Sequence, residues 1–367
     1  GHLLTYWDMC RNLFKAFPWY SEESRHQLGL GTPPVEMVHA TLLRYLLAGE
    51  DYADAYRPAF YAENVEHMEG MDVPATMTRW ESSPVLALAD ALIERGLPEN
   101  IELLRAGHGL EARYSVQVEA LRKHLAENPL PAFSAGEASQ AEQGRRFLDS
   151  SIGHVHAHHR SGEGRPLVTL HSAGRSAGSF TDEIGGLVEG REVWALDLPH
   201  HGASPDLPAE VPHSPETLAA PLADALKGAG LKDIDVIASG LGAAVALALA
   251  EALDVREIRL VAPEPPSDTQ RKEGLASGLP DLSPRLDGTH VIAAWDFARA
   301  RRVFSPPWDY SSEGQRKQAL STDPREVHDE AAEMLRVGAQ WRAMMELELS
   351  IDWSAIAARD DITMIEV

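Results

Sequence analysis

The sequence predicts an α/β fold, a doubly wound and mostly parallel sheet with added helical segments, present as two partial copies in tandem. Three observations lead to this prediction. Short Val/Ile/Leu-rich strands alternate with helical segments in the second half of the chain. A stretch near the start is repeated at an offset of 288 residues. Between the copies, residues 127–145 are rich in Pro, Ala, Ser and Gly and are typical of a linker.

The repeat begins with "HLLTYWDMCRN" from His2, which matches "HVIAAWDFARA" from His290. A Trp-Asp-x-x-Arg pattern recurs in both copies, as Trp7, Asp8 and Arg11 and as Trp295, Asp296 and Arg299. This spacing puts Trp and Arg on one helix face, which suits the lining of a pocket. Helix packing with an Asp–Arg pair is the alternative. Both copies end in a strand-like run, at 73–80 and 361–367.

The remaining elements follow in order. In the second half, strands are expected in five segments: 153–160, 165–172, 192–199, 235–240 and 257–264. After its copy of the repeat, the first half has one more strand at 99–109 and an amphipathic helix at 115–128. We therefore expect the back half of a first unit at 1–126, a linker at 127–145, and the front of a second unit at 146–367. Such a chain is expected to be the middle of a tandem protein, with a processed product or a circular permutation as alternatives.

Several motifs resemble, in the right order, those of the α/β-hydrolase fold family. "RPLVTLHSAGRSAGSF" (165–180) is similar to its strand and oxyanion loop, and "VWALDLPHHGASPD" (193–206) to the next strand and turn. "DVIASGLGAAVALALA" (235–250) is similar to the nucleophile elbow and its helix. "IELLRAGHGLEARY" (101–114) resembles the last strand and the loop that carries the catalytic histidine. The resemblance implies that the repeated helical stretches form a cap. It also implies hydrolysis of ester, amide or related bonds in small, partly apolar molecules.

The elbow raises a question about its nucleophile. The sharp strand-to-helix turn needs small residues two before and two after the nucleophile. Ala238 and Gly242 satisfy this around Gly240, so the nucleophile position holds glycine. A frame centred on Ser239 would place Ile and Leu in the two small positions. We therefore expect a degenerate elbow at Gly240, with Ser239 as the alternative nucleophile.

The resemblance also implies the other parts of a catalytic site. Backbone N–H groups of Ser172, Ala173 and Leu241 are expected to form an oxyanion hole, because such donors do not depend on side-chain identity. His108 is the candidate general base, and Glu81 or Glu264 is the candidate acid. In a tandem arrangement His108 and the elbow belong to different sites.

Composition excludes several classes of partner. The net charge of −23 disfavours nucleic acid and anionic membranes, and the most apolar run is too short to span a bilayer. Cys10 is the single cysteine, which fits a reducing cytoplasm. His154, His156 and His158 share one strand face with metal-like spacing, but no Cys or carboxylate accompanies them. We expect an exposed polar face there, and neither metal nor cofactor.

These observations favour an enzyme of the hydrolase class that acts on a small molecule, with a second unit that is inactive as a serine hydrolase. Two other functions remain open. The second unit is either a non-catalytic module that binds a ligand or scaffolds its twin, or a serine-independent lyase on the same fold. A homo-oligomer and pairing with the missing halves of the units are both left open.

Overall fold

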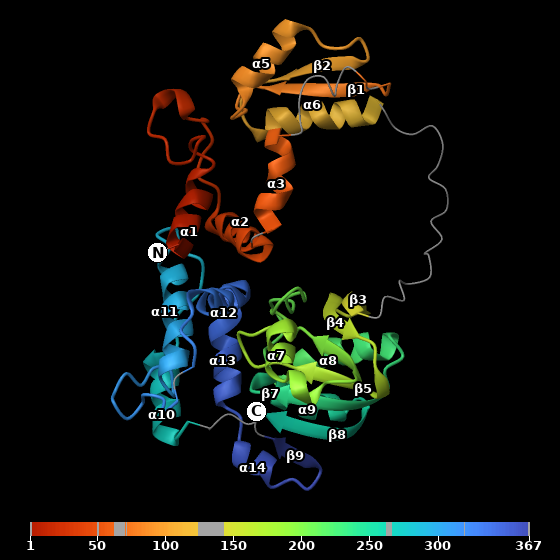
Figure 1. The fold of residues 1–367 in the computed structure, drawn as a ribbon, viewed down its shortest axis with the longest axis vertical. Helices are drawn as coiled ribbons and strands as arrows, with labels where there is room; N and C mark the ends of the chain where they lie inside the picture. Colours follow the sequence, from red (N-terminus) through yellow and green to blue (C-terminus); the bar gives the residue numbers. More distant parts are fainter. Residues whose placement is uncertain are drawn as a thin grey trace. The chain divides into compact units, whose positions relative to one another are not determined.

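The fold is described from a computed structural model, which covers residues 2–49, 51–61, 70, 72–123, 143–261, 266–318 and 320–365. Internal contacts divide the chain into two units, Gly1–Ala138 and Ser139–Val367. Figure 1 shows the elements of both. Each unit is described by itself.

The first unit combines a helical part with a small parallel sheet. Its helices and strands are α1 (His2–Asn12), α2 (Val35–Ala48), α3 (Asp51–Tyr61), β1 (Ala75–Trp80), α5 (Leu86–Arg95), β2 (Ile101–Ala106) and α6 (Leu110–Lys123), with a short 3₁₀ turn η1 at Ser24–His26. Strands β1 and β2 pair in parallel through the crossover helix α5. Both strands lie within segments predicted to be strands. Helix α6 begins five residues before the predicted helix because it starts directly after the loop that carries His108.

The second unit is built on a seven-stranded sheet. Its strands are β3 (Gln143–Ser150), β4 (Gly153–Arg160), β5 (Glu163–Leu170), β6 (Arg191–Leu196), β7 (Asp233–Ser239), β8 (Asp254–Val261) and β9 (Ile362–Ile365). They lie in the order β3-β4-β6-β5-β7-β8-β9. The pairs β3–β4 and β4–β6 are antiparallel and all others are parallel. The predicted mostly parallel sheet is confirmed. Strand β3 was not predicted, and it includes the last three residues of the predicted linker.

Helices cover both faces of this sheet. The helices of the second unit are α7 (Ala177–Glu183), α8 (Pro215–Gly228), α9 (Leu241–Ala250), α10 (Asp268–Glu273), α11 (Thr289–Val303), α12 (Pro324–Val337), α13 (Trp341–Leu349) and α14 (Trp353–Ala357), with short turns η2 (Gly185–Leu187), η3 (Gly274–Gly278) and η4 (Gly338–Gln340). Of these, α7, α8, α9 and α14 contact strands of the sheet. Phe180 of α7 packs in one cluster with Leu167 and Ile237. The neighbouring strand residues Val168 and Val236 are also buried and point to the opposite face, because side chains alternate along a strand.

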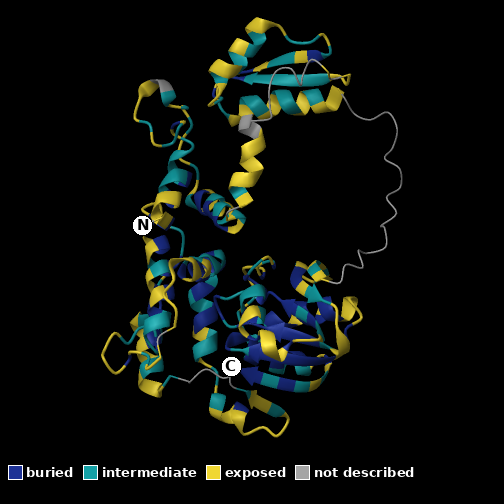
Figure 2. Cartoon of the chain, viewed as in Figure 1, coloured by how far each residue is buried: buried dark blue, intermediate teal, exposed yellow. Residues whose placement is uncertain are grey.

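Burial on both faces explains the sequence of the central strands. Val236, Ile237 and Ala238 of β7 are all almost fully buried, so this part of the strand is a continuous apolar run rather than an alternating one. Figure 2 shows this buried core at the strands of the second unit.

A helical excursion lies between β8 and β9, where the resemblance implied a cap. Helix α11 packs against α12, and α13 contacts α9 at the end of the sheet. Inside the excursion, the rings of Phe297 and Trp341 meet edge to face at 5.0 Å. Among the described residues, no helix has the length and apolar character needed to cross a membrane.

Candidate functional site

The turn between β7 and α9 is the centre of the candidate site. Gly240 stands between the last strand residue, Ser239, and the first helix residue, Leu241, with φ 50° and ψ −125°. Gly242 lies so close to β5 that a Cβ on it would overlap the carbonyl oxygen of Leu170. A side chain is therefore excluded two residues after Gly240, as the frame centred on Gly240 requires.

A carboxylate from the cap occupies this turn. The N–H groups of Ala173 and Leu241 both donate to Oε2 of Glu348 on α13, each at 2.7 Å. A Cβ on Gly240 would overlap the same oxygen and would lie 2.5 Å from Cβ of Ser172. The Glu348 carboxylate thus fills the space that a side chain at position 240 would need. Of the three backbone groups predicted as oxyanion donors, those of Ala173 and Leu241 meet at one oxygen atom, which belongs to Glu348.

Burial sets the electrostatics of Glu348. Removal from water raises the pKa of its carboxyl group above the ordinary range, although the two N–H donors and the positive charge of Arg301 act in the opposite direction. The ionised form is therefore costly in this position, even with two hydrogen bonds.

Two buried histidines shape the loop that carries Ala173. The Nε2 atom of His171 accepts from the N–H of Leu198 at 3.1 Å, so Nδ1–H donates to the carbonyl oxygen of Ser172 at 2.8 Å. His201 accepts in the same way from the N–H of Gly174 at 3.1 Å. Burial lowers the pKa of both imidazoles, that of His201 to about 3. Both rings are therefore neutral near pH 7, and each acts as a fixed acceptor for a backbone N–H.

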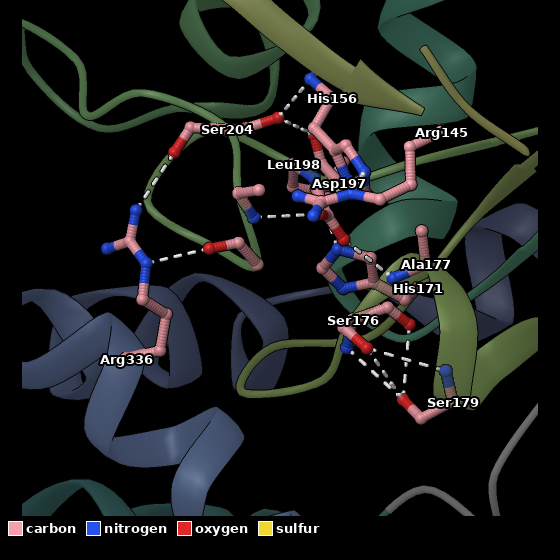
Figure 3. A network of polar contacts seen from close by, with 12 residues as sticks. Arg145, His156, His171, Ser176, Ala177, Ser179, Asp197, Leu198, Ser204 and Arg336 are labelled. Atoms are coloured by element: carbon pink, nitrogen blue, oxygen red, sulfur yellow. Dashed lines mark hydrogen bonds and ion pairs between the residues drawn. The ribbon is translucent and has the colours of Figure 1, made fainter. Parts of the chain in front are cut away.

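A polar network centred on Asp197 supports the turn after β6 (Figure 3). Its carboxylate accepts from Nδ1 of His156 at 2.7 Å and from the N–H groups of Ala177 and Ala203 at 2.8 Å. Burial alone would raise the pKa of Asp197, but these hydrogen bonds and the nearby His171 lower it to about 2. The hydroxyl of Ser204 donates to the backbone carbonyl of Asp197 rather than to the imidazole. The side chains of Ser204, His156 and Asp197 therefore stabilise a turn and do not form a nucleophilic triad.

The network corrects one prediction. The face of His154, His156 and His158 was expected to be exposed, but His156 is only 2% exposed. The reason is β3, which pairs with β4 and brings Arg145 to His156, where Nε of Arg145 donates to Nε2 at 3.0 Å. Among the described residues, no group of three His, Cys, Asp or Glu side chains is placed to hold a metal ion.

A pocket of about 370 Å³ lies beside Glu348, within the second unit. Its wall includes Glu348, Met345, Gln270, Trp308, Arg301 and Arg316. The indole N–H of Trp308 donates to the carbonyl oxygen of Gln270 at 2.9 Å, which fixes the ring. Arg301 pairs with Glu330 at 2.9 Å. The pocket thus combines apolar, aromatic and cationic groups within the size range of small-molecule sites.

Sequence comparison identifies the family of the second unit's fold. The model of the alpha/beta hydrolase family matches residues 167–362, more than half of the chain. The chain belongs to the alpha/beta hydrolase family. No curated protein sequence is significantly similar to it.

Solved structures of alpha/beta hydrolases are similar to this chain at low identity. One is a mutant of the N-acyl homoserine lactonase AidH bound to N-hexanoyl homoserine, with 19% identity and a TM-score of 0.42, which covers 61% of this chain and 78% of that one. Another is an epoxide hydrolase from an endophytic Streptomyces, with 14% identity and a TM-score of 0.39, which covers 60% of this chain and 76% of that one. A third is the epoxide hydrolase CorEH, with 18% identity and a TM-score of 0.40, which covers 61% of this chain and 81% of that one.

The first unit has a separate group of site residues. His108 follows β2 and Glu81 follows β1, and their Nε2 and Oε2 atoms are 3.2 Å apart. The hydroxyl of Ser82 accepts from the N–H of Gly109 at 3.1 Å and lies 3.4 Å from Nδ1 of His108. They line a pocket of about 700 Å³. The predicted acid and base are therefore brought together, because both follow adjacent parallel strands. The other candidate acid of the alpha/beta hydrolase pattern, Glu264, lies outside the described residues.

The repeated Trp-Asp-x-x-Arg set differs between the two copies. In the first, Trp7 is buried and Arg11 forms an ion pair with Asp8, which matches the packing alternative. In the second, Trp295 is half-buried, whereas Asp296 and Arg299 are exposed. The arginine that reaches the pocket of the second unit is Arg301, two residues further along α11.

Glu348 is a functional candidate that was not predicted from the sequence. The sequence of α13 contains a pattern that could have indicated it: Trp341, Met344, Met345 and Glu348 share one helix face. The first three are buried, so an acidic residue ends an otherwise apolar stripe. Acidic residues are rare on such a face unless they have specific partners.

Proposed function

We propose that the second unit of this alpha/beta hydrolase is a ligand-binding unit that does not perform serine hydrolysis. One observation carries the proposal: Glu348 accepts the Ala173 and Leu241 N–H groups, in the space that a nucleophile at Gly240 would need. A substrate carbonyl oxygen needs these donors in the transition state. While Glu348 holds them, no acyl group binds there productively.

The alternative nucleophile, Ser239, has little support. It is the last residue of β7 and pairs with Val261 in the sheet, so it precedes the sharp turn. Its hydroxyl makes no hydrogen bond to any described side chain, whereas an active serine needs a base within reach. The tight approach of Gly242 to β5 supports Gly240 as the turn residue.

We assign the hydrolysis of small, partly apolar esters or amides to the first unit. This is supported by the contact of Glu81 with His108 at 3.2 Å beside a pocket. Residues 1–126 contain no counterpart of "VIASGLGAA", so this site needs a nucleophile from another segment.

The tandem arrangement of two partial copies is part of the proposal. It is supported by matching details in the two units. Isolated β-bridges occur at the same offset of 288 residues, Ala16 with Gln27 and Phe304 with Gln315. The helices α2 and α12 both end at a glycine of positive φ, Gly49 and Gly338. We further propose a cytoplasmic location, in keeping with the single, buried Cys10.

A serine-directed fluorophosphonate tests the proposal. We expect no labelling of Ser239 in the full chain, read by mass spectrometry of the peptide that contains it, under conditions that fully label an active serine hydrolase. Ser239→Ala is the matched control for background signal. Stoichiometric labelling of Ser239 that Ser239→Ala removes would show that the second unit retains an activated serine.

A further inference from the structure

The two N–H groups that hold Glu348 form a site that does not depend on their present occupant. The N–H of Gly242 donates to the carbonyl oxygen of His171 at 3.1 Å, and the N–H of Gly174 donates to His201 at 3.1 Å. These bonds set the orientation of the loop around Ala173 and of the first turn of α9. The donors of Ala173 and Leu241 therefore stay in place when Glu348 leaves.

The occupant itself shows which chemistry the site accepts. One carboxylate oxygen receives both N–H groups at 2.7 Å, a length typical of charge-assisted hydrogen bonds. Leu241 is the first residue of α9, so its N–H also lies at the positive end of a helix. The two donors thus converge on a single oxygen acceptor, and a carboxyl oxygen is the acceptor seen on them.

Glu348 is a replaceable ligand. It stands one residue before the end of α13, its side chain has several rotatable bonds, and it forms part of the wall of the 370 Å³ pocket.

The pocket defines the rest of the ligand. Trp308 and Met345 offer apolar surface, and Arg301 and Arg316 add positive charge to the same wall. These groups suit a molecule with a short apolar body and one negative charge. An amide or ester of the same size would form weaker hydrogen bonds with the two donors.

We propose that the second unit binds a small organic acid, whose carboxylate takes the Ala173 and Leu241 N–H groups and replaces Glu348. The inference rests on the proposed function, because a catalytic unit would keep these donors for a substrate carbonyl. Glu348 then acts as an internal competitor that closes the site in the absence of ligand.

The test measures the binding of sodium hexanoate to the full chain by calorimetry, with hexanamide as the neutral probe. We expect Glu348→Ala to lower the Kd for hexanoate about tenfold, because the ligand no longer competes with an internal carboxylate. Hexanamide should gain much less. Glu346→Ala is the matched control, since Glu346 pairs with Arg342 on the exposed side of the same helix, and it should leave the Kd unchanged.

Two further measurements cover misfolding of the alanine variant and binding of hexanoate at another place. Glu348→Gln keeps the size of the side chain but removes its charge, so it should also tighten hexanoate binding if the alanine variant does not fold. In a ¹⁵N-leucine-labelled chain, hexanoate should shift the amide signal of Leu241. Equal Kd values for wild type and both Glu348 variants, or an unmoved Leu241 signal at saturation, would overturn the inference.

Failure of this inference is distinguishable from failure of the proposed function. Labelling of Ser239 by a fluorophosphonate overturns the proposed function. An unlabelled Ser239, together with no gain in hexanoate affinity, overturns only the carboxylate site.

Discussion

Gly240 and Glu348 depend on each other at the level of single atoms. The positive φ of Gly240 is available to glycine at little cost, and the absence of a side chain makes room for the Glu348 carboxylate. Neither residue is explained alone. A glycine at an elbow would leave an empty space, and a carboxylate from the cap would have no place beside a larger residue.

A double-mutant cycle tests this dependence. Gly240→Ser should lower the free energy of unfolding of the second unit by about 1–3 kcal/mol, because the new side chain overlaps Glu348 and crowds Ser172. In a Glu348→Ala background the same change should cost at least about 1 kcal/mol less. Urea denaturation measures all four proteins.

Gly186→Ser is the control for this cycle, since Gly186 is exposed and has open space around it. Its effect should be the same with and without Glu348. Additive effects of Gly240→Ser and Glu348→Ala would mean that the two residues do not interact.

At the scale of elements, histidines hold the turns that surround the site. The loop after β5 and the turn after β6 are joined by His171 and His201, whose rings lie 4.9 Å apart. Each ring accepts a backbone N–H from the other segment. These hydrogen bonds exist only while the imidazoles are neutral.

The stability of the second unit should therefore fall in acid. The folded-state pKa of His201, about 3, lies below its ordinary value of 6.5. Its contribution is fully present above pH 6.5 and is lost as the pH falls through the folded-state value. His201→Asn should make the fall in unfolding free energy shallower, by up to about 1.4 kcal/mol per pH unit between pH 6 and 4.

Urea denaturation across this pH range measures the slope. Substitution of an exposed histidine, His154→Asn, is the comparison and should leave the slope nearly unchanged. Parallel pH profiles for wild type and His201→Asn would show that His201 titrates normally in the folded protein.

At the scale of the whole molecule, each unit has its own core. Trp7, Val38 and Leu42 are buried in the first unit, and Leu222 and Val236 in the second. A separate core is what allows a unit to unfold by itself.

Core truncations should therefore act on one unit at a time. Leu42→Ala should lower the unfolding free energy of the first unit by about 2–5 kcal/mol, and Leu222→Ala should do the same for the second. Amide hydrogen exchange with peptide resolution reads both units in one experiment. The exposed Leu88→Ala is the control. Equal loss of protection in both units after either truncation would indicate one cooperative structure.

Local patterns predicted much of this fold. Apolar runs marked the buried parallel strands, and small residues around Gly240 marked the sharp turn. The contact between Glu81 and His108 was also within reach, because residues that follow adjacent parallel strands meet at one edge. Strand β3 was not, since its polar and basic sequence becomes a strand only by pairing with β4.

The sequence by itself determined the alpha/beta hydrolase motifs, the alternation of strands and helices in the second half, and the small residues around Gly240, because each depends on residues close together in the chain. Only the tertiary structure decided what fills the elbow. Glu348 lies 107 residues after Leu241, and its approach depends on how α13 packs against α9. Such packing is set by the fit of whole faces, so the contact of Glu348 with the Ala173 and Leu241 N–H groups appears only when the chain is folded.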